Sequence, residues 1–190
     1  MRERLSTKFE NVRVLKSEVI YDKHGRKVVV DTLEFADGSR HQWVYFGGTE
    51  IKDKPTAVAV AAFTKDDKML LVKQYRHPLG KIIYDLPAGG LSGGEDPQRA
   101  ALRELEEETG YTAENLLWIG RFNWAPGNMA GIVELFFTKD LKVKSRFNSE
   151  EVADIEFIDF NVVLEKILKG ELIDSTLIIA ALMVKVKGLL

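Results

Sequence analysis

The sequence contains no cysteine, and this absence removes several classes of chemistry from consideration. Disulfide bonds, zinc sites built on thiolates and cysteine nucleophiles are all excluded. Long hydrophobic runs are missing as well, because the longest one, Leu177–Val184, is far too short to span a bilayer. The first ten residues also lack the apolar segment of a secretory signal. We therefore expect a cytoplasmic protein that does not associate with membranes.

A strong charge of either sign is also absent. The 190 residues include 27 Lys+Arg and 29 Asp+Glu, which gives a formal net charge of −2. Such a balance provides no general attraction to nucleic acid or to an anionic membrane. Phosphate groups must then be bound by cations or metal ions placed locally. We expect a small-molecule ligand and no nucleic-acid partner.

The sequence that is present is typical of a globular protein, with 45% hydrophobic and 29% charged residues. Its length suits one domain with a modest extension. The pattern of residues changes near residue 50, where β-type alternation gives way to longer apolar runs and helical spacing. We therefore divide the chain into a β-rich extension (residues 1–50) and an α/β domain (residues 51–190).

The extension is predicted to be a three-stranded meander. Strand-like segments occur at Val12–Ile20, Lys27–Phe35 and Gln42–Phe46, and Asp37-Gly38 is a hairpin signal between the last two. A meander of this size is stable only when its apolar face meets another surface, either the main domain or a second subunit.

Three aromatic residues of the last segment have two readings. Trp43, Tyr45 and Phe46 either pack within the sheet or offer a ring on which a nucleobase stacks. The sequence alone leaves both readings open.

The α/β domain contains several buried-strand patterns and three helical patterns. Expected strands lie at 56–63, 69–75, 82–90, 116–124, 132–138 and 151–158, with a sharp turn at 86–90 and a polar loop at 139–150. Expected helices span residues 97–109, 160–172 and 175–186. Alternation of these two kinds of element indicates an α/β fold.

The stretch Gly89–Tyr111 begins as a glycine-rich loop and continues as a helix. Asp96 suits the N-cap, Pro97 the first helical position, and Gly110 a left-handed C-terminal position. The helix carries Glu104, which starts a group of acidic residues.

Glu104, Glu107 and Glu108 are i, i+3 and i+4 neighbours and share one narrow sector of this helix. Like charges at this spacing destabilise a helix by a few tenths of a kcal/mol per pair, and a divalent cation reverses that penalty. Hard carboxylate oxygens suit Mg²⁺ or Mn²⁺. The alternative is a solvated acidic face, which most charge runs are.

The spacing of the whole stretch fits the pattern G-x5-E-x7-R-E-U-x-E-E-x-G-U, where U is a bulky apolar residue. The matching residues are Gly89, Glu95, Arg103, Glu104, Leu105, Glu107, Glu108 and Gly110. Chance agreement is on the order of 10⁻⁸ per window if each of the seven fixed positions matched at about 7%. The stretch resembles a Nudix box, although Tyr111 stands where an aliphatic residue is more usual.

Resemblance to the Nudix hydrolases implies an α/β/α sandwich with a mixed β-sheet, here preceded by the N-terminal β-meander. It implies that Glu104, Glu107 and Glu108 bind Mg²⁺ or Mn²⁺ and take part in catalysis. A backbone carbonyl of Ala88 or Gly89 is then expected to complete the metal shell.

Within the motif, Arg103 lies four residues before Glu107 and can reach back toward the loop. We expect Arg103 to pair with Glu95 and to fix the carboxylates, which is a structural role. Glu106 points away from the acidic sector and is expected to be solvated.

The order of elements is further similar to that of the ADP-ribose pyrophosphatases, a Nudix subgroup. Arg76 in Gln74-Tyr75-Arg76 and Pro126, sixteen residues beyond Gly110, match this subgroup. The similarity implies that Arg76, Pro126 and Gly127 contact substrate. It also implies that the N-terminal strands form a homodimer and that Trp43 or Tyr45 contributes to a base pocket.

Two positions depart from the subgroup. Asp85 replaces a longer glutamate before Leu86-Pro87-Ala88-Gly89, and Gly131 stands where an acidic residue commonly acts as a base or orients water. Other candidates for that task are Glu134, Glu150, Glu151 and a glutamate of the box. Glu134 alternates with apolar neighbours and is otherwise the solvent face of a strand.

We expect an enzyme that hydrolyses ADP-ribose to AMP and ribose 5-phosphate with Mg²⁺ or Mn²⁺. An alternative substrate is another nucleotide sugar, of the GDP-mannose or UDP-hexose type, because Gly131 replaces the acidic residue of the ADP-ribose pyrophosphatases. A non-catalytic nucleotide-binding regulator of the same fold is the third reading. It is disfavoured because every box carboxylate is present.

Overall fold

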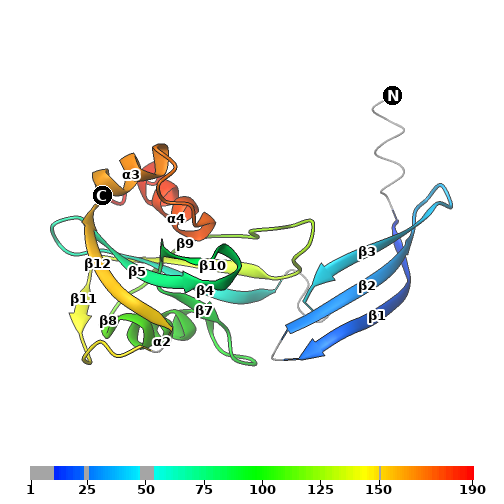
Figure 1. Cartoon of the computed structure of the whole chain (residues 1–190), viewed down its shortest axis with the longest axis horizontal. Helices are drawn as coiled ribbons and strands as arrows, with labels where there is room; N and C mark the ends of the chain where they lie inside the picture. The colour runs from blue at the N-terminus through cyan, green and yellow to red at the C-terminus, as the bar shows by residue number, and fades with distance from the viewer. Residues whose placement is uncertain (1–10, 24–25, 48–53, 150) are drawn as a thin grey trace. The chain divides into compact units, whose positions relative to one another are not determined.

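A computed structural model describes residues 11–23, 26–47, 54–149 and 151–190. The chain forms two compact units (Figure 1). The first unit comprises Met1–Lys54 and Ala125–Gly131, and the second comprises Pro55–Trp124 and Ile132–Leu190. The short loop 125–131 therefore groups with the N-terminal strands, although the strands that flank it in sequence belong to the second unit.

The first unit is built on the predicted meander of three antiparallel strands. These are β1 (Arg13–Lys23), β2 (Arg26–Glu34) and β3 (Arg40–Phe46), in the order β1-β2-β3. The predicted hairpin is present between β2 and β3, where Gly38 has a φ of 79° and Asp37 accepts a 3.0 Å bond from the Ser39 amide. A glycine suits this turn because it adopts positive φ without steric cost.

Loop 125–131 lies along β3. The Phe46 amide donates to the carbonyl of Asn128 at 2.6 Å, and the Ala130 amide donates to the carbonyl of Phe46 at 3.1 Å. Trp43 adds a side-chain bond, since its Nε1 donates to the carbonyl of Gly127 at 2.8 Å. These bonds satisfy backbone groups on an edge of the meander.

The second unit contains a mixed four-stranded sheet and a three-stranded antiparallel sheet. The first has the order β7-β4-β10-β9, with β4 and β10 parallel, and the second has the order β12-β5-β6. A short pair, β11-β8, accompanies them. The strands are β4 (Pro55–Ala62), β5 (Lys68–Arg76), β6 (Lys81–Asp85), β7 (Ala88–Gly90), β8 (Tyr111–Ala113), β9 (Leu117–Phe122), β10 (Ile132–Thr138), β11 (Leu141–Val143) and β12 (Val152–Asp159).

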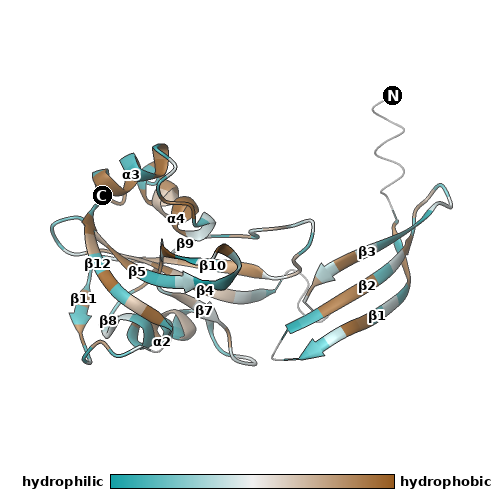
Figure 2. Cartoon of the chain, in the orientation of Figure 1, coloured by the Kyte–Doolittle hydropathy of each residue, from teal (hydrophilic) through white to brown (hydrophobic). Residues whose placement is uncertain are grey.

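Helices cover both sides of these sheets, so the second unit is the predicted α/β/α sandwich. Figure 1 shows α2 (Pro97–Thr109) on one side, with α3 (Phe160–Leu168) and α4 (Ser175–Val186) on the other. Hydrophobic residues are concentrated on α4 in Figure 2. Among the residues that the structure describes, no helix is long and apolar enough to cross a membrane.

The continuous apolar character of β4 follows from burial on both of its faces. Ala59, Ala61 and Phe63 belong to the core cluster beneath α3 and α4, whereas Val58 and Val60 belong to the cluster beneath α2. Because successive side chains of a strand point to opposite faces, a strand between two layers has no polar side.

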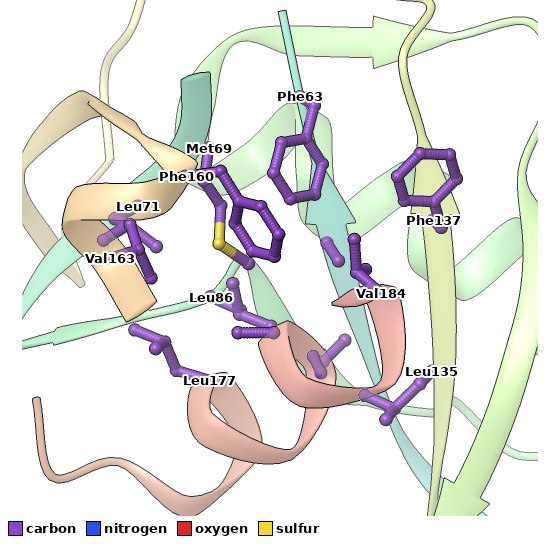
Figure 3. Packing of buried hydrophobic residues seen from close by; sticks show 14 of the residues in the cluster. Phe63, Met69, Leu71, Leu86, Leu135, Phe137, Phe160, Val163, Leu177 and Val184 are labelled. Atoms are coloured by element: carbon purple, nitrogen blue, oxygen red, sulfur yellow. The ribbon is translucent and has the colours of Figure 1, made fainter. Parts of the chain in front are cut away.

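Aromatic packing fills the first of these clusters. The ring centroid of Phe63 lies 5.6 Å from that of Phe137 and 5.3 Å from that of Phe160, and the latter pair is edge-to-face (Figure 3). Leu71 and Leu177, from β5 and α4, complete the same cluster. The second unit thus has a dry core that holds its sheets and helices rigidly in place.

Some predicted boundaries were wrong. The segment 139–150, expected to be loop throughout, contains β11, which pairs with β8 at Leu141↔Ala113. The expected segment 82–90 has strand β6 up to Asp85 and then turns, as predicted, but residues Ala88–Gly90 of the expected turn form a further short strand, β7. Helix α3 ends at Leu168 and not at Leu172, and Gly170 follows it in the left-handed conformation, with a φ of 71°.

The C-terminal end of α2 makes a close contact with the segment that follows β11. Gly110 ends the helix with a φ of 75°, and its carbonyl accepts from the amides of Lys144 and Ser145 at 3.0 and 3.1 Å. A Cβ at Gly110 would lie 2.7 Å from the Ser145 carbonyl oxygen. Glycine is therefore required here for space as well as for conformation.

Comparison of Gly110→Ala with Gly170→Ala isolates this contact. Both positions have nearly equal positive φ, but a Cβ at Gly170 meets nothing within 4 Å. We expect Gly170→Ala to cost about 1 kcal/mol of stability through backbone strain alone. Gly110→Ala should cost roughly 1–3 kcal/mol more because the segment must move. Urea unfolding followed by circular dichroism measures both, and equal losses would contradict the contact.

Candidate active site

The turn at β7 and the helix α2 place two box glutamates against backbone. A Cβ at Gly89 would overlap the carboxylate of Glu104, so only glycine allows this approach. The Ala88 amide donates to Oε2 of Glu108 at 2.9 Å. The structure therefore brings together Ala88, Gly89, Glu104 and Glu108, which the sequence motif separates by up to twenty residues.

Arg103 connects the remaining members of the motif. Its Nε and Nη2 donate to the two carboxylate oxygens of Glu95, both at 3.1 Å, and Nη2 also donates to the Gly90 carbonyl at 2.9 Å. Its Nη1 donates to Glu104 at 2.7 Å and to Glu107 at 3.1 Å. One guanidinium thus fixes the loop, the turn and two of the helix carboxylates.

The field around the buried carboxylates is acidic. Burial and, to a lesser degree, the charges of Glu104, Asp85 and Glu151 together raise the pKa of Glu108 to about 8, although the bond from the Ala88 amide lowers it. Burial also raises the pKa of Glu104, although its bond to Arg103 opposes the shift. Carboxylates whose pKa values are raised in this way provide a favourable place for a cation, because a bound cation stabilises their charged forms.

The donor set fits a hard divalent cation. Oxygen atoms are available from Glu104, Glu107 and Glu108 and from the carbonyls of Ala88 and Gly89, and such ligands suit Mg²⁺ or Mn²⁺. Within the described parts of the chain, no three acidic or histidine side chains lie close enough to form a ready-made metal cluster. Glu104 and Glu107 are instead bonded to Arg103, so a cation must compete with this guanidinium.

Among the residues described, Arg76 is not bonded to any of these carboxylates and pairs with Asp85. Its Nη2 bonds to the carboxylate of Asp85, which also accepts from the Leu86 amide at 2.8 Å. Asp174, the N-cap of α4, lies beside Asp85, and burial followed by the Asp85 charge raises its pKa to about 6. Sequence reasoning missed this neighbour, because nothing near Asp174 along the chain points to Asp85.

The three acidic candidates for a base or water-orienting group differ in position. Glu134 is buried and accepts from Nε1 of Trp118, which corrects the reading of a solvent-facing strand residue. Glu134 on β10 is paired with Val58 on β4, and Val58 is paired with Gly89 on β7. The backbone of Glu134 is therefore two strands away from the turn, a total of about 10 Å. Glu151 is exposed and close enough to raise the pKa of both Glu104 and Glu108. Glu150 lies outside the described residues.

The first unit contains a largely apolar pocket of about 390 Å³. Its lining includes Trp43, Tyr45, Pro126 and Gly127, the four residues of this unit that the sequence singled out for substrate. Asp31, buried among the apolar residues, is also part of the lining and accepts a bond from Ser17. Sequence reasoning missed Asp31 because an acidic residue in an alternating strand normally indicates the solvent face.

Comparison with known proteins identifies relatives that match most of the chain. The profile of the NUDIX domain matches residues 53–178. The chain is 37% identical over 171 residues to a methanol dehydrogenase activator from Bacillus methanolicus, covering 88% of this chain and 89% of that protein. It is 38% identical over 158 residues to an ADP-ribose pyrophosphatase from Bacillus subtilis (strain 168), covering 83% and 81%.

A solved structure shares the fold. A crystal structure of an ADP compounds hydrolase superposes with a TM-score of 0.80, covers 93% of each chain and is 20% identical in sequence. At this level of sequence identity, the similarity shows a shared fold only. It covers the N-terminal strands as well as the sandwich.

The raised pKa of Glu108 predicts how metal affinity changes with pH. Below its pKa of about 8, Glu108 is protonated in the metal-free protein and must lose that proton before it can ligate. We expect the affinity for Mn²⁺ to rise about tenfold per pH unit between about pH 6 and pH 8 and then level off. Calorimetric titrations in buffers of different ionisation enthalpy measure the affinity and the released proton. Affinity that is independent of pH would contradict this role.

Proposed function

Because this chain belongs to the NUDIX family, we propose that it hydrolyses the diphosphate bond of a nucleoside diphosphate sugar with the help of Mg²⁺ or Mn²⁺. The preferred substrate in this proposal is ADP-ribose, which yields AMP and ribose 5-phosphate. One observation carries the reaction type, namely the half-buried carboxylate of Glu104 and the buried carboxylate of Glu108 at the Gly89 turn. Similarity to an ADP-ribose pyrophosphatase over most of both chains supports the substrate.

In this reaction the chain's own residues bind the cation, position the cation's ligands and accept a proton from water. Glu104, Glu107 and Glu108, with the carbonyl of Ala88 or Gly89, hold the cation. When bound, it neutralises phosphate charge in the transition state and lowers the pKa of a water molecule. Arg103 is a positioning residue, since it connects two of these carboxylates to the loop.

Glu151 is the candidate that fits the general base best. A general base must reach the water that attacks phosphorus, and Glu151 is close enough to the box to affect two of its carboxylates. Glu134 fits less well because Trp118 occupies its carboxylate and a strand separates it from the turn. We therefore assign the proton-accepting role to Glu151 ahead of Glu134.

Recognition of the nucleobase is assigned to the pocket of the first unit. The ring of Trp43 is half exposed and offers a stacking surface, and the buried Tyr45 and the loop residues Pro126 and Gly127 form part of the same lining. Arg76 is the candidate for a substrate phosphate. Its side chain is 40% exposed, so it can contact a ligand while it remains bonded to Asp85.

Association of two copies through the N-terminal strands is part of the proposal. Strand β1 is exposed along its whole length, includes apolar residues such as Val19 and Ile20, and forms an edge of its sheet. An exposed edge with apolar side chains is suited to pairing with another chain. Residues 1–50 then serve as a module for dimer formation and base binding, and residues 51–190 as the hydrolase domain.

A second candidate substrate is a GDP- or UDP-linked hexose. The observation that favours it is Gly131, which replaces the acid that commonly follows the proline loop of ADP-ribose pyrophosphatases. A regulator without catalysis is weaker, although one relative is named a methanol dehydrogenase activator. The complete set of box carboxylates favours turnover.

A substrate panel tests the reaction and the substrate together. We expect purified protein with Mg²⁺ to convert ADP-ribose faster than GDP-mannose, UDP-glucose or ATP. Glu108→Gln should reduce kcat at least about 100-fold, because a metal-binding carboxylate becomes a neutral amide. Glu165→Gln, on the exposed surface of α3, is the matched control and should retain activity. Turnover of ATP alone, or full activity of Glu108→Gln, would overturn the proposal.

A comparison of Glu151→Gln with Glu134→Gln tests the base. We expect Glu151→Gln to reduce kcat by about 100-fold with a smaller change in KM, since a positioned base contributes roughly 10²–10⁴-fold. Glu134→Gln should reduce kcat far less. A large loss of kcat in Glu134→Gln together with nearly full activity of Glu151→Gln would reverse the assignment.

A further inference from the structure

A second pocket lies beside the box, in the second unit, and differs in character from the apolar pocket of the first unit. Its volume is about 410 Å³, and its lining is polar. We call it the polar pocket; it is lined by Arg103, Glu106, Glu107, Ser145, Arg146 and Asn148. Helix α2 supplies the first three residues, and the segment between β11 and β12 supplies the others.

The wall supplied by this segment is held in place at several points. Besides the two backbone bonds to Gly110, Nζ of Lys144 donates to Glu106 at 2.8 Å. The contact at Gly110 leaves no room for a side chain between helix and segment. In Figure 1 the chain after β11 passes α2 on its way to β12. The pocket is therefore built into the fold and is not a gap beside a loose loop.

Arg146 differs from the other cationic side chains near this pocket in its ion pairing. Arg103 is committed to Glu95, Glu104 and Glu107, and Lys144 is committed to Glu106. Arg146 makes no ion pair within the described portion of the chain. A guanidinium with its donors available, in a polar pocket, is suited to a phosphate group, which it binds through two parallel hydrogen bonds.

The position of the pocket relates it to the proposed reaction. Glu107 belongs both to the pocket lining and to the expected metal ligands. A group attached to a diphosphate at the box can therefore extend directly into the pocket. Asn148 and Ser145 provide the amide and hydroxyl groups that bind sugar hydroxyls, whereas nothing in this lining offers an aromatic face for a base.

We propose that the polar pocket binds the sugar phosphate half of the substrate, with Arg146 contacting the phosphate and Asn148 the sugar hydroxyls. This inference rests on the proposed function, because it assigns one half of the same substrate. Its volume lies within the usual 300–1,000 Å³ of ligand pockets, near the lower end, which suits part of a nucleotide sugar. This assignment concerns the sugar phosphate half alone and is separate from the assignment of the nucleobase.

Binding of the two products separates these assignments. The measurement is calorimetric titration of the full-length protein, with Mg²⁺, by ribose 5-phosphate and by AMP; mannose 1-phosphate is a third probe for the hexose alternative. We expect Arg146→Gln to weaken sugar phosphate binding about tenfold, the usual effect of a charged hydrogen bond, and to leave AMP binding unchanged. Arg99→Gln, an exposed arginine of α2 outside the pocket, is the matched control and should bind both products normally.

Turnover gives a second and independent result. Arg146→Gln should raise KM for the nucleotide sugar about tenfold with a smaller change in kcat. If sugar phosphate binding depends on Arg146 while wild-type protein hydrolyses no nucleotide sugar, the pocket assignment holds and the proposed function fails. If the protein hydrolyses ADP-ribose while Arg146→Gln binds the sugar phosphate as wild type does, or loses AMP instead, the pocket assignment is wrong and the function holds.

Discussion

The bonds of Arg103 hold together parts of the site that the chain delivers from different directions. A guanidinium has five donors in a fixed plane, and here they reach Glu95 in the loop, Gly90 in the turn, and Glu104 and Glu107 on the helix. Without such a cation, three carboxylates on one helix sector would repel one another and raise the cost of folding α2. Two of the bonded carboxylates, Glu104 and Glu107, are ligands of the proposed cation. Under the proposed function, a bound cation would therefore compete with Arg103 for them.

Most of the second unit could be predicted from the sequence because its signals are local. Alternation and apolar runs located β4, β5 and β10, and capping residues located both ends of α2. The elements that were missed, β8 and β11, are three residues each and pair with one another across 28 positions of sequence, as Leu141 and Ala113 show. Strands that short carry too few residues for a periodic pattern, and only the tertiary fold forms them.

The site was predictable to the extent that it lies in one stretch. The motif places Glu104, Glu107, Glu108 and Arg103 on one helix, and spacing alone indicates which of them share a sector. The neighbours of Arg76 were not predictable in this way. Asp174 reaches Asp85 from the far end of the chain, and a residue that caps a helix looks the same in sequence whether or not it has such a neighbour. The buried place of Glu134 is also a property of the sheet, since its partner Trp118 lies on the adjacent strand.

The membership of loop 125–131 in the first unit has a consequence for how the two units are joined. The chain passes from one unit to the other three times, after Lys54, after Trp124 and after Gly131. Deletion of the N-terminal strands would therefore also affect loop 125–131, which is bonded to them. A chain that began at Pro55 would retain the loop but lose β3, and the carbonyl of Asn128 and the amide of Ala130 would lose the backbone partners that Phe46 provides. The first unit therefore depends on a loop whose two ends are held by strands β9 and β10 of the second unit.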